Sequence, residues 1–183
     1  MPDGERKSGI PLSVETPAPV RTTHGWRVRM SSASASALTG SDRRDSAAVD
    51  FRFETEVRVR FAETDAQGIA HNSVYLVWFE LARIDYLARF RGGYPGLRAD
   101  GVEALTVEAH VRYLAPARFD DRLTVRARCG ELRGARFRFD YSVERGSEAI
   151  ADGSTRHACV DARTHRPIRV PSWLADEIAT AES

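Results

Sequence analysis

The most constraining feature of this sequence is residues 72–91, which read as one helix that is apolar around most of its circumference. Aromatic and aliphatic side chains recur on several sides at helical spacing, and four charged residues form a narrow polar stripe: Glu80, Arg83, Asp85 and Arg89. Such a helix must be covered by other elements on more than one side. Gly92-Gly93 is expected to end it, and Pro95-Gly96 to continue the break.

Alternation of apolar and polar residues predicts five strands around this helix. The first strand precedes the helix, and its apolar side consists of Phe53, Thr55, Val57, Val59 and Phe61. Four more follow over about 107–113, 123–129, 135–143 and 150–160, with turns at 131–134 and 145–147. A short helix over 172–179 follows Pro171. This order predicts an α+β fold in which an antiparallel five-stranded sheet is wrapped around one long central helix.

The first 50 residues show neither the helical spacing nor the strand alternation of apolar residues. They hold four of the eight prolines and a low-complexity run of serine and alanine at 31–37. We predict a disordered tail over 1–50 and a single domain over 51–183. Two alternatives stay open: residues 21–40, with arginine and serine but no acid, faintly resemble an organellar transit peptide, and Met30 could be the true start.

Composition limits the partners, the cellular compartment and the cofactors that can be expected for this chain. The 27 basic and 26 acidic side chains give a net charge of +1, which provides no reason to expect nucleic acid as a partner. No stretch is apolar enough to span a membrane, and the N-terminus carries no secretory signal, so a cytoplasmic protein is expected. Cys129 and Cys159 lie in strand-like runs and are expected to be reduced, buried thiols. His110 and His157 have no partners at metal-ligand spacing, so neither a metal nor another cofactor is expected.

A single curved sheet also leaves long unpaired edges. We therefore expect two copies to join or pack their sheets, giving a homodimer or homotetramer with the active site at the dimer interface.

A family resemblance is carried by residues 58–83, which read RVRFAETDAQGIAHNSVYLVWFELAR. This segment resembles hotdog-fold thioesterases of the 4-hydroxybenzoyl-CoA thioesterase type and the acyl-CoA thioesterases associated with the Tol-Pal system. Those proteins share a strand, an aspartate, a glycine three residues later, and an aromatic helix with a Glu-x-Ala-Arg ending. The resemblance covers about residues 51–171 and implies a hotdog fold that hydrolyses an acyl-CoA or acyl-carrier-protein thioester.

The same resemblance assigns candidate site residues. The family's catalytic carboxylate matches Asp65, and its oxyanion donor, a peptide N–H at the start of the long helix, matches Asn72. Family members carry tyrosine or histidine at that position, so only the backbone role carries over. Gly68, His71 and Tyr75 are expected at the substrate. His71 could polarise the substrate or be an ordinary first-turn residue, and Tyr75 could belong to the core as well.

Thioester hydrolysis explains why these residue types are needed. The first turn of a helix presents unpaired N–H groups and the positive end of the helix dipole, which stabilise an oxyanion. Asp65 could then attack the carbonyl carbon or deprotonate a water, and the sequence does not choose between them. Glu80 is a rival carboxylate, although pairing with Arg83 explains it better.

Other functions fit this sequence less well. A non-catalytic acyl-thioester-binding protein or regulator has no need of a carboxylate beside the carbonyl. Hotdog thioesterases of polyketide release often lack the loop aspartate. Hotdog dehydratases need a histidine with a carboxylate in a motif that this sequence lacks.

Overall fold

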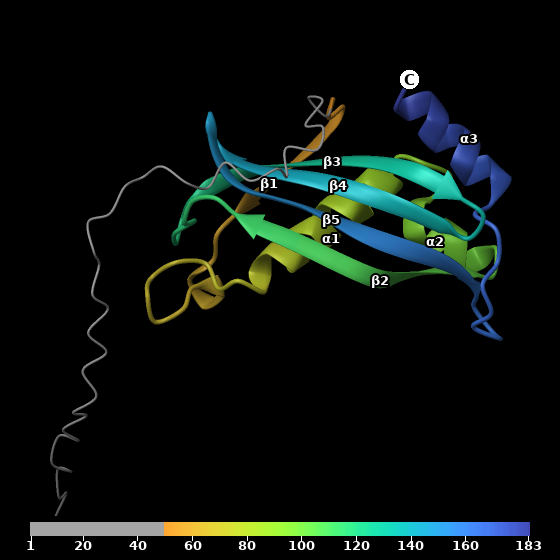
Figure 1. Ribbon diagram of the computed structural model, residues 1–183, viewed down its shortest axis with the longest axis horizontal. Helices are drawn as coiled ribbons and strands as arrows, with labels where there is room; N and C mark the ends of the chain where they lie inside the picture. The colour runs from red at the N-terminus through yellow and green to blue at the C-terminus, as the bar shows by residue number, and fades with distance from the viewer. Residues whose placement is uncertain (1–49) are drawn as a thin grey trace, which may run out of the picture. The chain divides into compact units, whose positions relative to one another are not determined.

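The computed structural model describes residues 50–183. These residues form one five-stranded antiparallel sheet with the strand order β1-β3-β4-β5-β2 (Figure 1). The strands are β1 (Phe53–Arg58), β2 (Val102–Tyr113), β3 (Arg122–Arg133), β4 (Arg136–Arg145) and β5 (Glu148–Asp161). The predicted sheet is confirmed. Hairpins join β3 to β4 and β4 to β5 as expected, although β3 continues to Arg133 and the first turn lies at 134–135. β2 begins five residues earlier than predicted, at Val102.

The strands alternate as their sequences predict. In β3 and β4 every second side chain is buried, so that one face of the sheet forms the core. Its central members are Leu123, Val125, Ala127, Cys129, Phe137, Phe139, Tyr141 and Val143. Cys129 and Cys159 are both free and buried, as predicted.

The long helix, α1 (Val74–Leu87), lies across this apolar face of the sheet (Figure 1). Its inner side contributes six buried residues: Tyr75, Trp78, Phe79, Ala82, Tyr86 and Leu87. The ring of Phe79 stacks on Tyr141 with centroids 4.2 Å apart. The outer side does not follow the prediction of a helix covered on most sides. In the single chain Leu76, Val77, Leu81 and Ile84 are exposed, because the sheet covers only one face of α1.

The predicted end of the long helix is wrong. α1 stops at Leu87, and a second helix, α2 (Gly93–Ala99), follows where a continuing break was expected. Arg91, Gly92 and Gly93 all have positive φ, which turns the chain between the two helices. Pro95 lies in the first turn of α2, where its missing N–H costs no helical hydrogen bond.

The first strand also ends earlier than predicted. β1 stops at Arg58, and a short 3-10 helix, η1 (Phe61–Glu63), follows. Phe61 is therefore 76% exposed instead of facing the core, and its ring packs edge-to-face against Phe119 with centroids 5.8 Å apart. The predicted C-terminal helix is confirmed as α3 (Ser172–Ala181).

The disordered tail predicted for residues 1–50 lies outside the described residues, apart from residue 50. Among the helices formed by residues 50–183, none has the length and apolar character needed to cross a membrane.

Candidate active site

The candidate carboxylate lies in a tight loop between η1 and α1. Thr64 and Ala70 pair across the base of this loop, and within it the Asp65 N–H donates to the Ile69 carbonyl at 2.9 Å. One carboxylate oxygen of Asp65 accepts the Gln67 N–H at 2.7 Å. Gly68 completes the turn with a φ of +72°, a conformation that L side chains rarely adopt. The position of the Asp65 carboxylate is therefore set by the backbone of its own loop.

The start of α1 lies directly after this loop. The helix begins at Val74, two residues later than the predicted start at Asn72, and residues 72–73 form a turn in which the Val74 N–H donates to the His71 carbonyl at 2.9 Å. Within residues 50–183 the Asn72 N–H has no backbone acceptor. A peptide N–H at a helix start that is not used by the fold is available to a ligand.

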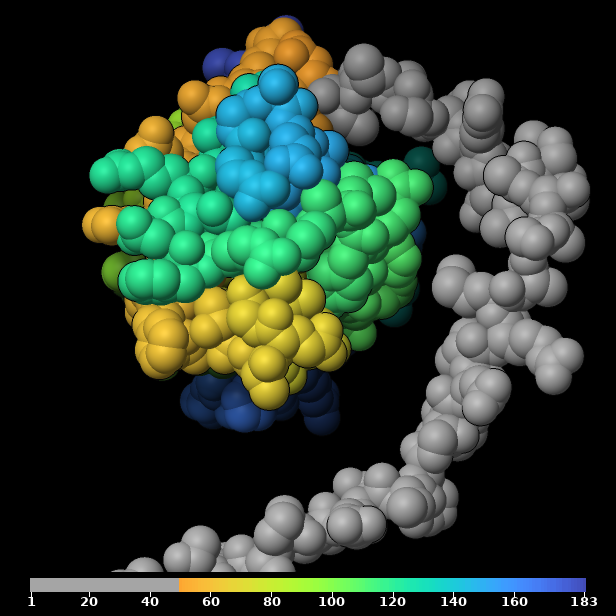
Figure 2. Space-filling model, turned by 90° about the vertical axis from the view of Figure 1, so that its left-hand side faces the viewer, coloured from red at the N-terminus to blue at the C-terminus, as the bar shows by residue number. Residues whose placement is uncertain are grey.

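Asp65, His71 and Asn72 line one open pocket of about 540 Å³. Its other walls come from Tyr75 on α1 and from residues 113–116 at the end of β2. The Ala70 N–H donates to the Ala117 carbonyl at 2.8 Å, which joins the loop to the segment after β2. Figure 2 looks onto this end of the molecule, where the yellow surface of the loop lies against the green surface around residues 110–120.

The residues predicted to contact the substrate differ in their position relative to the pocket. His71 is exposed at its rim, whereas Tyr75 is 3% exposed and belongs to both the core and the pocket wall. Burial raises the pKa of Tyr75 above its ordinary value, so the side chain is a neutral phenol. Gly68 is not among the pocket-lining residues, and its part in this structure is to close the turn below Asp65.

Two contacts at the helix start were not predicted from the sequence. The Tyr113 hydroxyl donates to the Asn72 carbonyl at 2.8 Å. The Nδ1 atom of His71 lies 2.9 Å from the Ser73 hydroxyl and 3.3 Å from the Ser73 peptide nitrogen. The alternating pattern placed Tyr113 on a strand, but nothing in the sequence indicated that the end of this strand reaches the start of α1.

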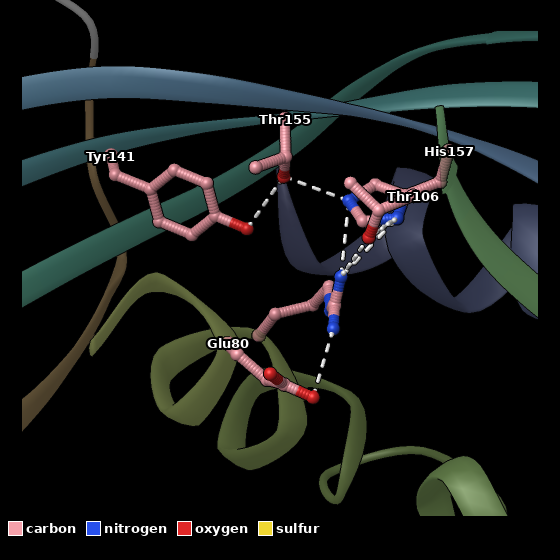
Figure 3. Close-up of polar contacts among 6 residues, drawn as sticks. Glu80, Thr106, Tyr141, Thr155 and His157 are labelled. Atoms are coloured by element: carbon pink, nitrogen blue, oxygen red, sulfur yellow. Dashed lines mark hydrogen bonds and ion pairs between the residues drawn. The ribbon is translucent and has the colours of Figure 1, made fainter. Parts of the chain in front are cut away.

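Glu80 does not share the pocket with Asp65. It forms an ion pair with Arg83 at 3.7 Å, as predicted, and belongs to a separate polar cluster between α1 and the sheet (Figure 3). In this cluster Arg83 contacts the ring of His157 at 3.2 Å, and His157 contacts the Thr155 hydroxyl at 2.7 Å. Burial, followed by the charge of Arg83, lowers the pKa of His157 to about 3. No pattern in the sequence indicated that this strand histidine is a buried, neutral contact of an arginine.

Comparison with known proteins gives consistent results. The thioesterase-like superfamily matches residues 59–178. The acyl-CoA thioesterase YbgC of Haemophilus influenzae is 30% identical over 124 residues, covering 67% of this chain and 91% of that protein. A 1,4-dihydroxy-2-naphthoyl-CoA hydrolase of a Synechococcus strain is 30% identical over 126 residues, covering 63% of this chain and 85% of the hydrolase. The crystal structure of a hypothetical protein from Thermus thermophilus is 40% identical, with a TM-score of 0.63 over 70% of this chain and 95% of that one.

Proposed function

Because this chain belongs to the thioesterase-like superfamily and has its hotdog fold, we propose that it hydrolyses an acyl-CoA thioester to the free acid and the thiol. The observation that carries the proposal is the pocket shared by Asp65 and Asn72, whose N–H has no acceptor in the described part of the chain. A carboxylate and a hydrogen-bond donor facing one cavity can act on a carbonyl from both sides. Relatives that act on acyl-CoA and on 1,4-dihydroxy-2-naphthoyl-CoA support the substrate class.

The reaction needs two actions from these groups. The Asn72 N–H, at the positive end of the α1 dipole, donates to the carbonyl oxygen and stabilises the negative charge that develops there. The Asp65 carboxylate either attacks the carbonyl carbon, expelling the thiolate and leaving a mixed anhydride, or takes a proton from a water that attacks in its place. The Tyr75 phenol and the apolar residues 114–116 would hold the acyl end of the substrate.

Removal of the carboxylate tests the assignment. Asp65→Asn keeps the size of the side chain and an oxygen that can accept from Gln67, but loses the charge. We expect release of free CoA to fall by about 10³-fold or more, with an unchanged melting temperature. Asp176→Asn, on the exposed side of α3, is the matched control and should hydrolyse normally. Wild-type turnover by Asp65→Asn would reject the assignment.

A thiol-release screen separates the remaining alternatives. Wild-type protein should be assayed with aryl, short-chain and long-chain acyl-CoA and with an acylated carrier protein. Binding of acyl-CoA without release of CoA would favour the non-catalytic binding protein, and cleavage of the carrier-protein thioester alone would favour the polyketide-release type. A single turnover in H₂¹⁸O tests nucleophilic attack: water that cleaves the anhydride at the Asp65 carbonyl leaves ¹⁸O in the protein, whereas a water activated by Asp65 as a base places it in the released acid.

We propose further that two copies of the chain join along β2 and that the partner covers the site. β2 lies at the edge of the sheet, with one side of its backbone unpaired. Within residues 50–183 the exposed large apolar side chains gather on β2 and the residue after it, on the outer side of α1, and on the Phe61–Phe119 pair. Tyr113 and Leu114 belong to both this apolar surface and the pocket. Exposed apolar side chains that gather in this way are typical of a protein–protein contact surface.

The assembly can be tested without substrate. We expect wild-type protein to sediment as a dimer or tetramer of the 20.4 kDa chain. Val107→Arg places a charge on the exposed edge of β2 and should shift the protein toward the monomer, with a loss of activity. Ala179→Arg, on the exposed side of α3, should leave the assembly intact. A monomeric wild-type protein with full activity would contradict this part of the proposal.

A further inference from the structure

The contacts of His71 define which of its nitrogens carries a proton. The Ser73 peptide N–H points at Nδ1 at 3.3 Å, and a peptide N–H can only donate. Nδ1 must therefore offer its lone pair, and the Ser73 hydroxyl, 2.9 Å away, donates to the same atom. In a neutral imidazole the proton then lies on Nε2.

The Nε2–H group of His71 is left free by the fold. Within residues 50–183 the polar contacts of this ring all run through Nδ1. His71 is exposed and lines the same pocket as Asp65 and Asn72. A residue that lines the pocket thus keeps a side-chain N–H donor, one position before the proposed peptide donor.

A contact at the carbonyl of the peptide between Asn72 and Ser73 also favours the Nε2–H tautomer of His71. The Tyr113 hydroxyl donates 2.8 Å to the carbonyl of this peptide, and the N–H of the peptide donates to His71. Hydrogen bonds that run in one direction through a peptide polarise one another. Tyr113 also packs edge-to-face against Tyr75 with centroids 4.9 Å apart, which fixes the direction of its ring.

We propose that His71 is a second oxyanion donor: its Nε2–H donates to the thioester carbonyl oxygen together with the Asn72 N–H, and Ser73 and Tyr113 hold it in that tautomer. This inference rests on the proposed thioester hydrolysis. His71 forms no covalent bond and transfers no proton; it stabilises the charge that develops on the oxygen while Asp65 acts. In this account Ser73 and Tyr113 are positioning residues.

The tautomer can be tested without any substrate. In protein labelled with ¹⁵N-histidine, the His71 signals, assigned by their disappearance in His71→Phe, should show the Nε2–H tautomer at pH 8. Tyr113→Phe removes the hydroxyl that polarises the peptide and should increase the population of the other tautomer. An Nδ1–H tautomer of His71 in the wild-type protein would overturn the inference.

Kinetics test the role itself. His71→Phe keeps a planar ring without a donor, and we expect kcat to fall by about 10²-fold with little change in KM, because the bond strengthens only as charge develops. Tyr113→Phe should lower kcat less, and His165→Phe, at an exposed histidine in the turn after β5 and outside the pocket, should leave it unchanged. Unchanged kcat in His71→Phe, or an effect on KM alone, would refute the role. A wild-type protein that hydrolyses no acyl-CoA would contradict the proposed function instead, and the tautomer measurement would still stand.

Discussion

A buried histidine that resists protonation should make this protein lose stability in mild acid. His157 is fully buried, and its ring stacks on Phe137 with centroids 5.1 Å apart. Burial, with a further contribution from the Arg83 charge, lowers the pKa of His157 from 6.5 to about 3. In the unfolded chain the imidazole returns to its ordinary pKa, so between these two values the unfolded state binds one more proton than the folded state.

The direction and size of the effect follow from this difference. The contribution of His157 to stability is complete above pH 6.5 and is lost as the pH falls toward the pKa of the folded state, near 3. The slope is about 1.4 kcal/mol per pH unit. Between pH 7.5 and 4.5 the free energy of unfolding should therefore fall by about 3 kcal/mol through this one group.

The assay is urea unfolding, followed by tryptophan fluorescence, at pH 7.5 and 4.5. His157→Gln can still donate to Thr155 and accept from Arg83, but it does not titrate. Carboxylates contribute to the pH dependence of both proteins, so the difference between the two pH dependences isolates the histidine. His110→Gln, at an exposed position, should behave as the wild type does. If His157→Gln lost as much stability between the two pH values as the wild type, the reasoning would be refuted.

Two further variants test the core. Gly153→Ala would place a Cβ 2.6 Å from the Phe79 ring and against the His110 carbonyl, so we expect a loss of about 1–3 kcal/mol in urea unfolding, whereas Gly130→Ala, with no atom within 4 Å, should cost far less. Glu182→Ala removes the acceptor of the Tyr86 hydroxyl, 2.6 Å away, and of the Cys129 N–H, 3.1 Å away. This buried polar loss should lower the melting temperature and cost about 1–3 kcal/mol, and an unchanged melting temperature would show that α3 does not anchor the end of the sheet.

The sheet could be predicted from the sequence because each strand encodes its own two faces. In β4 the alternation from Phe137 to Val143 is enough to place the apolar side chains inward, whatever the strand pairs with. The inner side of α1 follows from its 3.6-residue period in the same way. These patterns are local, so they can be recognised without knowledge of the tertiary structure.

The errors arose where local patterns continue past the real ends of elements. Ala88, Arg89 and Phe90 suit a helix as well as the residues before them do, so the end of α1 at Leu87 was not visible. Phe61 continues the alternation of β1, yet the chain has already turned into η1. In both places backbone turns that depend on the rest of the fold override the local preference.

The site was only partly predictable for a different reason. The resemblance to the thioesterase family assigned Asp65 and Asn72 as candidates, and both lie within one short motif of the sequence. Tyr113 is 41 residues from Asn72, and its contact exists only because the end of β2 reaches the start of α1. The same holds for His157 and Arg83, which are 74 residues apart. A sequence pattern can predict the loop, but it cannot predict which distant residues the sheet places next to that loop.

Of the two polar clusters along α1, the one at its middle contributes to stability and the one at its start is the proposed site of the chemistry. The middle of the helix is fixed to the sheet by the Phe79–Tyr141 stack and by Arg83, whose contacts with His157 and Thr106 reach two strands. At the start of the helix the Tyr113 hydroxyl donates to the Asn72 carbonyl, and within residues 50–183 the Asn72 N–H has no acceptor. A helix anchored at its middle can present unsatisfied donors at its tip without losing its position, and oxyanion stabilisation requires donors that are already oriented. The buried cluster around Arg83 therefore allows the residues at the start of α1 to keep their donors free and oriented.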